Sequence, residues 1–160
     1  MSSSSLRPST WKLLEALIVE QARHATGYPS AAPVFAQLGM SIDEGRDHLD
    51  ELAELDMAQI HARSVPHFDV LWRGREEAAK RGLGIASPVA DANKLLELAR
   101  SLENGTKQVH GRDLVHHFGW EGRRGLDAAQ VLESREEANL RRFIGGSFTI
   151  ILTARGRRRP

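Results

Sequence analysis

The sequence predicts a mainly α fold with small β-hairpins (α+β), built as two tandem units of about 80 residues each. One observation is a repeat, because several identical residues lie 80 positions apart: Gly39 and Gly119, Gly45 and Gly125, Leu52 and Leu132, Phe68 and Phe148. A second is that the Lys-Leu-Leu-Glu of residues 12–15 and the Arg-Gly-Arg of residues 73–75 recur 82 positions later. A third is that, in each half, the spacing of apolar residues changes from a helical period to the alternation of a strand. A repeat of this length indicates two small domains and not a solenoid.

The composition fits a globular protein, with 41% apolar and 27% charged residues in a chain of 160. Because cysteine is absent, the chain has neither a disulfide framework nor a thiolate metal site. No apolar run approaches the ~20 residues that a membrane span needs. The first residues lack the basic-then-apolar order of a signal peptide. We therefore expect a cytoplasmic protein without membrane contact.

The net charge of +1 conceals a difference between the two halves. Residues 1–80 hold 8 Lys/Arg and 12 Asp/Glu, a net charge of −4, whereas residues 81–160 hold 14 and 9, a net charge of +5. Such an asymmetry indicates that the halves meet different partners. The expected organisation is a disordered N-terminus (1–8), a first domain (9–80), a linker (81–88), a second domain (89–155) and a basic tail (156–160).

The first half opens with two amphipathic helical patterns. After Pro8, apolar residues recur three and four positions apart, which predicts a helix with this buried face: Trp11, Leu14, Leu17 and Ile18. Ser30 can cap a second, short helix. The apolar face of this helix is Phe35 and Leu38, and Gly39 can end it.

A capping box predicts the start of a third helix. Ser41 stands at the N-cap position and Glu44 follows three residues later. The side chains expected to point inward are Ile42, Leu49, Leu52 and Leu55. After Met57 the period changes to two, which predicts a hairpin of residues 58–61 and 68–71. A short helix over 73–80 then leads into the linker.

The second half repeats this order. Asp91 can cap a helix that Asn104 and Gly105 close, and a short helix with Leu114, Val115 and Phe118 ends at Gly119. A third helix over 121–136 is expected to bury Leu126, Ala129 and Leu132. Two strands, 139–144 and 147–152, surround a Gly-Gly turn at 145–146. The apolar residues of these elements predict one core in each half: Leu14, Phe35, Leu38, Leu49, Leu52, Phe68 and Val70 in the first, and Leu95, Leu114, Phe118, Leu132, Phe148 and Ile150 in the second.

Helix, short helix, helix and hairpin is an order that resembles the winged helix-turn-helix superfamily, here in tandem duplicate. Residues 35–41 resemble its second helix and turn, and residues 49–52 its third helix. Residues 150–157 are similar to its last wing strand and Leu-Thr-x-x-Gly exit, of which residues 70–75 are a shortened version. The resemblance implies DNA binding, with the third helix in the major groove and the wing on the backbone or in the minor groove.

The third helix of the first half suits this role poorly. It displays seven carboxylates against Arg46 and His48: Asp43, Glu44, Asp47, Asp50, Glu51, Glu54 and Asp56. Carboxylates repel the phosphates that a DNA-binding surface must neutralise. We expect the acidic helix over 41–56 to be a solvated face, or to serve a protein partner or self-association.

The second half carries the candidate DNA-binding residues. Arg123 and Arg124 stand in the first turn of its third helix, where arginine can read guanine edges, and Gln130 follows. The remaining candidates are arginines of the wing and tail that can contact phosphates: Arg141, Arg142, Arg155, Arg157, Arg158 and Arg159. A basic tail that only solubilises the chain is the alternative.

No residue pattern indicates catalysis, a metal or a cofactor. The histidines at 61, 67, 110, 116 and 117 lack the spacing of a metal site, and no nucleophile is marked by its surroundings. Two hypotheses remain. One is a DNA-binding protein, a transcriptional regulator, that contacts duplex through its second copy. The other is a protein–protein adaptor made of tandem winged helices, of the kleisin-associated or sorting-complex type.

Overall fold

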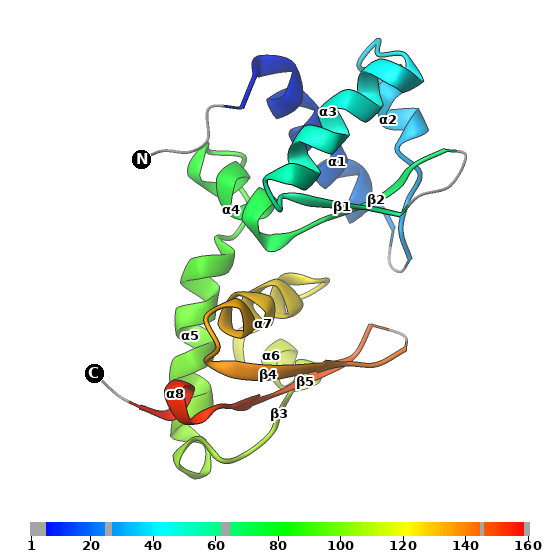
Figure 1. The fold of residues 1–160 in the computed structure, drawn as a ribbon. Coiled ribbons are helices and arrows are strands. Elements are labelled where there is room, and N and C mark those ends of the chain that lie inside the picture. Colours follow the sequence, from blue (N-terminus) through cyan, green and yellow to red (C-terminus); the bar gives the residue numbers. More distant parts are fainter. Residues whose placement is uncertain (1–5, 25–26, 62–64, 145, 159–160) are drawn as a thin grey trace. The chain divides into compact units, whose positions relative to one another are not determined.

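The computed structural model describes residues 6–24, 27–61, 65–144 and 146–158. Contacts divide the chain into two compact units, one through Ile85 (unit 1) and one from Ala86 onward (unit 2). Each unit combines helices with a small antiparallel sheet (Figure 1), in agreement with the expected α+β class. None of the helices in the described ranges is both long and apolar enough to cross a membrane.

Unit 1 places three helices before a hairpin and one after it. Its elements are α1 (Pro8–Ala22), α2 (Ala32–Gln37), α3 (Ile42–Glu54), β1 (Ala58–His61), β2 (His67–Val70) and α4 (Trp72–Lys80). The strands β1 and β2 pair antiparallel, with Ala58 opposite Val70. Ser30 forms an isolated antiparallel bridge with His67. The segment before α2 therefore adds a rudimentary third strand beside β2.

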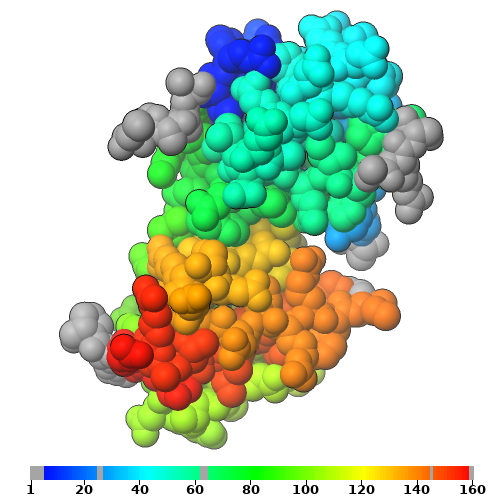
Figure 2. All heavy atoms as spheres, viewed as in Figure 1, coloured from blue at the N-terminus to red at the C-terminus, as the bar shows by residue number. Residues whose placement is uncertain are grey.

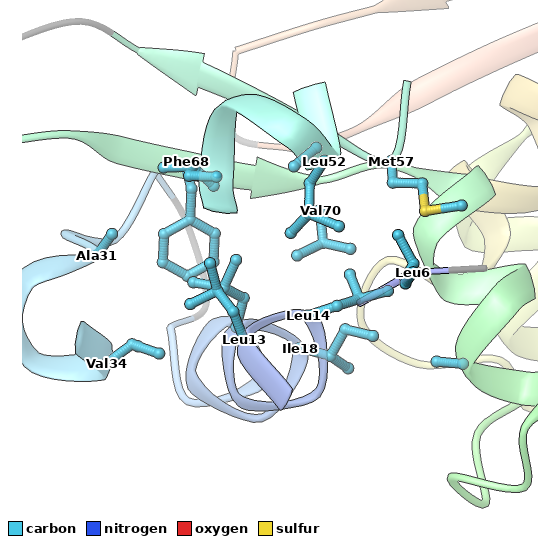
Figure 3. Packing of buried hydrophobic residues seen from close by; sticks show 14 of the residues in the cluster. Leu6, Leu13, Leu14, Ile18, Ala31, Val34, Leu52, Met57, Phe68 and Val70 are labelled. Carbon is cyan, nitrogen blue, oxygen red and sulfur yellow. The ribbon is translucent and has the colours of Figure 1, made fainter. Parts of the chain in front are cut away.

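The core of unit 1 contains most of the apolar side chains that the periodicity selects. The predicted residues that are buried are Leu14, Phe35, Leu49, Leu52, Phe68 and Val70, while Leu38 packs at the edge. Figure 3 shows Phe68 of β2 beside Leu13 of α1, a fully buried residue outside the predicted set. Burial of a side chain of this size contributes roughly 1.5–3 kcal/mol, so this cluster is the main stabilising feature of unit 1.

The ordered structure begins earlier than expected. Leu6 is buried in the core, Arg7 Nε donates to Glu51 Oε1 at 2.9 Å, and Pro8 is the first residue of α1. The expectation of a disordered N-terminus over 1–8 is therefore wrong for residues 6–8, while residues 1–5 lie outside the described ranges. An apolar residue and a salt bridge tie this segment to α3.

Helix α3 begins as its capping box predicts but buries a narrower face. The Glu44 N–H donates to Ser41 Oγ at 3.1 Å, and the Ser41 N–H donates to Glu44 Oε1 at 3.4 Å. Ile42 and Leu55, which we expected inside, are 41% and 39% exposed. They lie at the first residue and just past the end of the helix, beyond the reach of the core.

Unit 2 contains η1, a short 3-10 helix, and a three-stranded sheet. Its elements are α5 (Pro88–Ser101), η1 (Glu103–Gly105), β3 (Val109–His110), α6 (Gly111–Phe118), α7 (Arg124–Ser134), β4 (Ala138–Arg142), β5 (Phe148–Leu152) and α8 (Ala154–Arg157). The strand order is β3-β5-β4, with Ala138 of β4 opposite Leu152 of β5. This is the same order that Ser30, β2 and β1 form in unit 1.

The core prediction for unit 2 holds at most positions. Five of the predicted residues are buried: Leu95, Leu114, Leu132, Phe148 and Ile150. Phe118, the sixth residue of the predicted core, is only half-buried, and Val115 on the same short helix is 48% exposed. The cap of α5 is Ser87, whose side chain accepts from the Ala90 N–H, and not Asp91 as predicted. Asp91 instead lies inside the first turn of α5, where its carboxylate accepts hydrogen bonds from Arg124.

Matching backbone features relate the two units. Gly39 and Gly119 both take a positive φ, as do Asp56 and Glu136. A Cβ added at Gly74 would collide with the Met57 carbonyl oxygen, and one added at Gly156 would collide with that of Glu137. Arg75 Nε donates to the Val70 carbonyl, and Arg157 Nη1 donates to the Leu152 carbonyl. The repeated Arg-Gly-Arg therefore has the same local function in both units, since it closes the end of the hairpin.

One pairing from the sequence repeat is wrong. Phe68 lies opposite Ile60, and Ile150 lies opposite Leu140, so the counterpart of Phe68 is Ile150 and not Phe148. The offset changes from 80 to 82 within the hairpin because the turn of unit 2 is two residues longer.

Candidate functional site

The β4–β5 hairpin of unit 2 carries two of the predicted DNA-binding residues at its outer end. Arg141 and Arg142 are the last residues of β4, opposite Thr149 and Phe148. Both side chains are exposed, and neither forms a hydrogen bond or ion pair within the described ranges. Their positive charges are thus available to an anionic partner.

The apex of the same hairpin is apolar, a feature that the sequence reasoning missed. Phe143 is 48% exposed and Ile144 is fully exposed. The strand prediction extended β4 to Ile144, whereas the strand ends at Arg142 and Ile144 belongs to the turn. Gly146 has a φ of 88°, which suits the expected Gly-Gly turn, and Gly145 lies outside the described ranges. Figures 1 and 2 show the hairpin end, in orange, extending away from the body of unit 2.

Arg124, predicted to read base edges from α7, is held inside its own unit. Its Nε and Nη2 atoms donate to the two carboxylate oxygens of Asp91 at 2.7 and 3.0 Å. The hydrogen bonds to Asp91 raise the pKa of Arg124 above its ordinary value. The Arg124 guanidinium also lies 5.1 Å from the ring centre of Trp120. This bidentate geometry uses the donors that base reading would require.

The other two predicted residues of α7 are not free on the surface either. Arg123, the N-cap residue of α7, donates from Nε to Asp127 Oδ1 at 3.0 Å, one helical turn further on. Gln130 is half-buried, and its side-chain carbonyl oxygen is buried without a hydrogen-bond partner in the described part of the chain. The first turn of α7 therefore presents no arginine free of a carboxylate.

The arginines after β5 belong partly to the fold. Thr153 caps α8 by accepting from the Gly156 N–H at 3.1 Å. Arg155 lies 3.9 Å from Glu136, with both side chains well exposed, and the carbonyl of Arg158 accepts from Arg100 Nη2 at 2.6 Å. The expected tail over 156–160 is therefore ordered through Arg158, and Arg159 lies outside the described ranges. The side chains of Arg155, Arg157 and Arg158 are exposed and extend the positive surface of unit 2.

Helix α3 of unit 1 presents the opposite charge. Its exposed carboxylates are Asp43, Glu44, Asp47, Asp50 and Glu54. Glu51 is less exposed. Burial acts to raise its pKa, but hydrogen bonds with Arg7 and Thr10 and the charges of Arg7 and His48 lower the pKa overall. The acidic face predicted over 41–56 is thus present on an ordered helix.

The predicted residues fall into two groups. Arg141 and Arg142 are exposed together on one hairpin, whereas Arg123 and Arg124 are bound to carboxylates. Within the described ranges, no group of three or more His, Asp or Glu side chains is arranged to hold a metal ion. No protein-family model, curated protein or solved structure matches the chain. The function is therefore inferred from the residues of this chain.

Proposed function

We propose that the protein is a cytoplasmic DNA-binding protein of the winged helix-turn-helix superfamily, a transcriptional regulator built from two tandem copies. Contact with duplex DNA comes mainly from the β4–β5 hairpin of unit 2, which corresponds to the wing of this fold. The arginines of the chain segment after β5 add to the same positive surface. Unit 1 contributes little to this contact.

Two features support the family. Each unit contains a helix, a short helix and a third helix before a hairpin, and in each the segment before the short helix pairs with the second hairpin strand. The positive φ of Gly39 and Gly119 marks the turn between the short and third helices in both units. A helix-turn-helix followed by a wing combines these elements in this order.

The observation that carries the proposal is the pair of unneutralised arginines at the end of β4. A protein gains affinity for DNA by neutralising phosphates and releasing condensed counterions. Arg141 and Arg142 can do so without breaking any interaction of unit 2. The acidic α3, the third helix of unit 1, would meet phosphates unfavourably.

The same geometry favours backbone contact over base reading. Withdrawing Arg124 from Asp91 would leave a carboxylate whose side chain is only 3% exposed without its partner. Leaving such a charge buried and unpaired is strongly unfavourable. We therefore expect binding that depends steeply on salt and only weakly on base sequence.

A salt titration with mixed-sequence duplex tests the proposal. Removing one arginine from a phosphate lowers the slope of log K against log salt by about 0.9, because one condensed counterion fewer is released. Arg141→Ala with Arg142→Ala should therefore weaken binding to all sequences alike and flatten the slope by about one to two. The matched control is Lys12→Ala with Arg46→Ala, which removes two exposed charges from unit 1 and should leave the slope unchanged.

One observation favours a second function. The exposed acidic face of α3 suits a basic protein partner or self-association, as in an adaptor of tandem winged helices of the kleisin-associated or sorting-complex type. If the full chain shows no salt-dependent affinity for duplex, or if the control pair reduces the slope more than the arginine pair, the DNA proposal is wrong and the adaptor replaces it.

A further inference from the structure

The apex of the β4–β5 hairpin presents two adjacent apolar side chains, Phe143 and Ile144, to solvent. Single exposed apolar residues are common and need no explanation. Here they are neighbours, and Ile144 occupies a turn position at which Gly, Asn, Asp or Ser would be favoured. Because Ile144 is fully exposed, it contributes nothing to the packing of unit 2. Removing the Ile144 side chain from water is favourable, but this can happen only when a partner covers it.

Backbone pairing orders the two strands up to the apex. The last strand pair joins Arg142 and Phe148, and the Phe143 N–H donates to the Ser147 carbonyl at 2.9 Å. These contacts fix the approach to the turn before any partner binds. A hairpin ordered in advance loses little conformational entropy when it enters a groove.

The charges beside the apex identify the partner. Arg141 and Arg142 immediately precede Phe143, and neither has a carboxylate partner in the described ranges. Proteins that enter the minor groove commonly combine arginine with an apolar wedge that separates two base pairs and bends the duplex. The winged helix resemblance already implies a wing on the backbone or in the minor groove. Resting on the proposed DNA binding, we infer that Ile144 at the apex of this wing inserts between two base pairs from the minor groove, with Arg141 and Arg142 on the flanking phosphates.

The free-energy cost of unstacking bases and the gain from burying Ile144 are of similar size. Unstacking one base step costs a free energy similar to that released by burying one isoleucine side chain. Net affinity then comes from the arginines, and insertion favours flexible pyrimidine–purine steps, which unstack most easily. An anionic membrane is a poorer partner, because two side chains bury far less apolar area than the single acyl chain that gives only marginal membrane binding.

Base unstacking measures the insertion directly. The full chain is added to a short duplex that carries 2-aminopurine at a central TA step, since the fluorescence of this base rises when it is unstacked. The fluorescence should rise with the wild-type chain and with Val115→Ala, a matched control that truncates an exposed apolar residue of α6. Ile144→Ala should remove the rise while weakening the Kd by no more than about tenfold, with an unchanged unfolding midpoint.

The outcomes separate this inference from the proposed function. Salt-dependent binding without a fluorescence rise, or with an equal rise for Ile144→Ala, overturns the insertion and leaves DNA binding intact. The absence of duplex binding overturns both. Binding to anionic vesicles that requires Ile144, with no duplex binding, assigns the apex to a membrane and also overturns the inference.

Discussion

Helices α3 and α7 are the third helices of their units, yet their charged side chains make different contacts. In α3 most carboxylates face solvent, while Glu51 is tied to the segment before α1 through Arg7. In α7 the charges at the first turn pair with carboxylates, Arg124 with Asp91 and Arg123 with Asp127. The third helix is therefore a core element in both units. In unit 2 the charge that is available to a partner lies on the β4–β5 hairpin.

The units share glycines that set the backbone as well as buried leucines of the core. Gly74 and Gly156 both lie where a Cβ would meet a carbonyl oxygen, and Gly45 and Gly125 both face a ring. The ring at Gly45 is that of Phe35 of α2, whereas Gly125 lies against Leu114 of α6 and, slightly further away, the ring of Phe148 of β5. The aromatic side chain that packs on the third helix thus comes from a helix in one unit and from a strand in the other.

The largest effect is expected from shortening a buried leucine in each third helix, which tests whether α3 and α7 pack in the same way. Leu52 and Leu132 are both fully buried at matched positions. Leu52→Ala and Leu132→Ala should each lower the free energy of unfolding by roughly 2–5 kcal/mol, because each loses apolar burial and leaves a cavity. Chemical denaturation of the full chain measures this. An unchanged unfolding midpoint for either variant would show that the helix does not pack as described.

A smaller effect should separate the charges of the two helices. Arg124→Ala leaves the buried Asp91 carboxylate without its bidentate partner, at a cost of about 1–3 kcal/mol in the free energy of unfolding. Asp50→Ala on the exposed face of α3 should change it by less than about 0.5 kcal/mol. Adding Asp91→Ala to Arg124→Ala should recover part of the loss, since no unpaired charge then remains. Equal effects of the Arg124 and Asp50 variants in denaturant titrations would contradict this difference.

The sequence predicts the elements of the fold well where the signal is local. The capping box of Ser41 and Glu44 and the glycines at 39 and 119 place the ends of helices because each satisfies or frees specific backbone groups. The buried leucines of α3 and α7 follow from helical periodicity. These features depend on residues a few positions apart, which a single sequence displays directly.

The candidate site was harder to predict because its geometry depends on distant residues. Asp91 and Arg124 are 33 residues apart, and no local pattern indicates that they pair. Phe148, from a strand that follows later in the chain, lies against Gly125 of α7, and no local pattern indicates this contact either. The apolar apex was missed because the predicted strand extended to Ile144, whereas β4 ends at Arg142 and leaves Phe143 and Ile144 in the turn region.

The central claim is that duplex DNA contacts the hairpin of unit 2 and not the third helix of unit 1. Backbone amide chemical shifts of the full chain, recorded during titration with mixed-sequence duplex, test it most directly. The largest changes should fall in β4, β5 and the apex residues Phe143 and Ile144, and they should diminish as salt is raised. The amides of α3 should remain unchanged. Changes concentrated in α3, with the β4–β5 hairpin unaffected, would contradict the account.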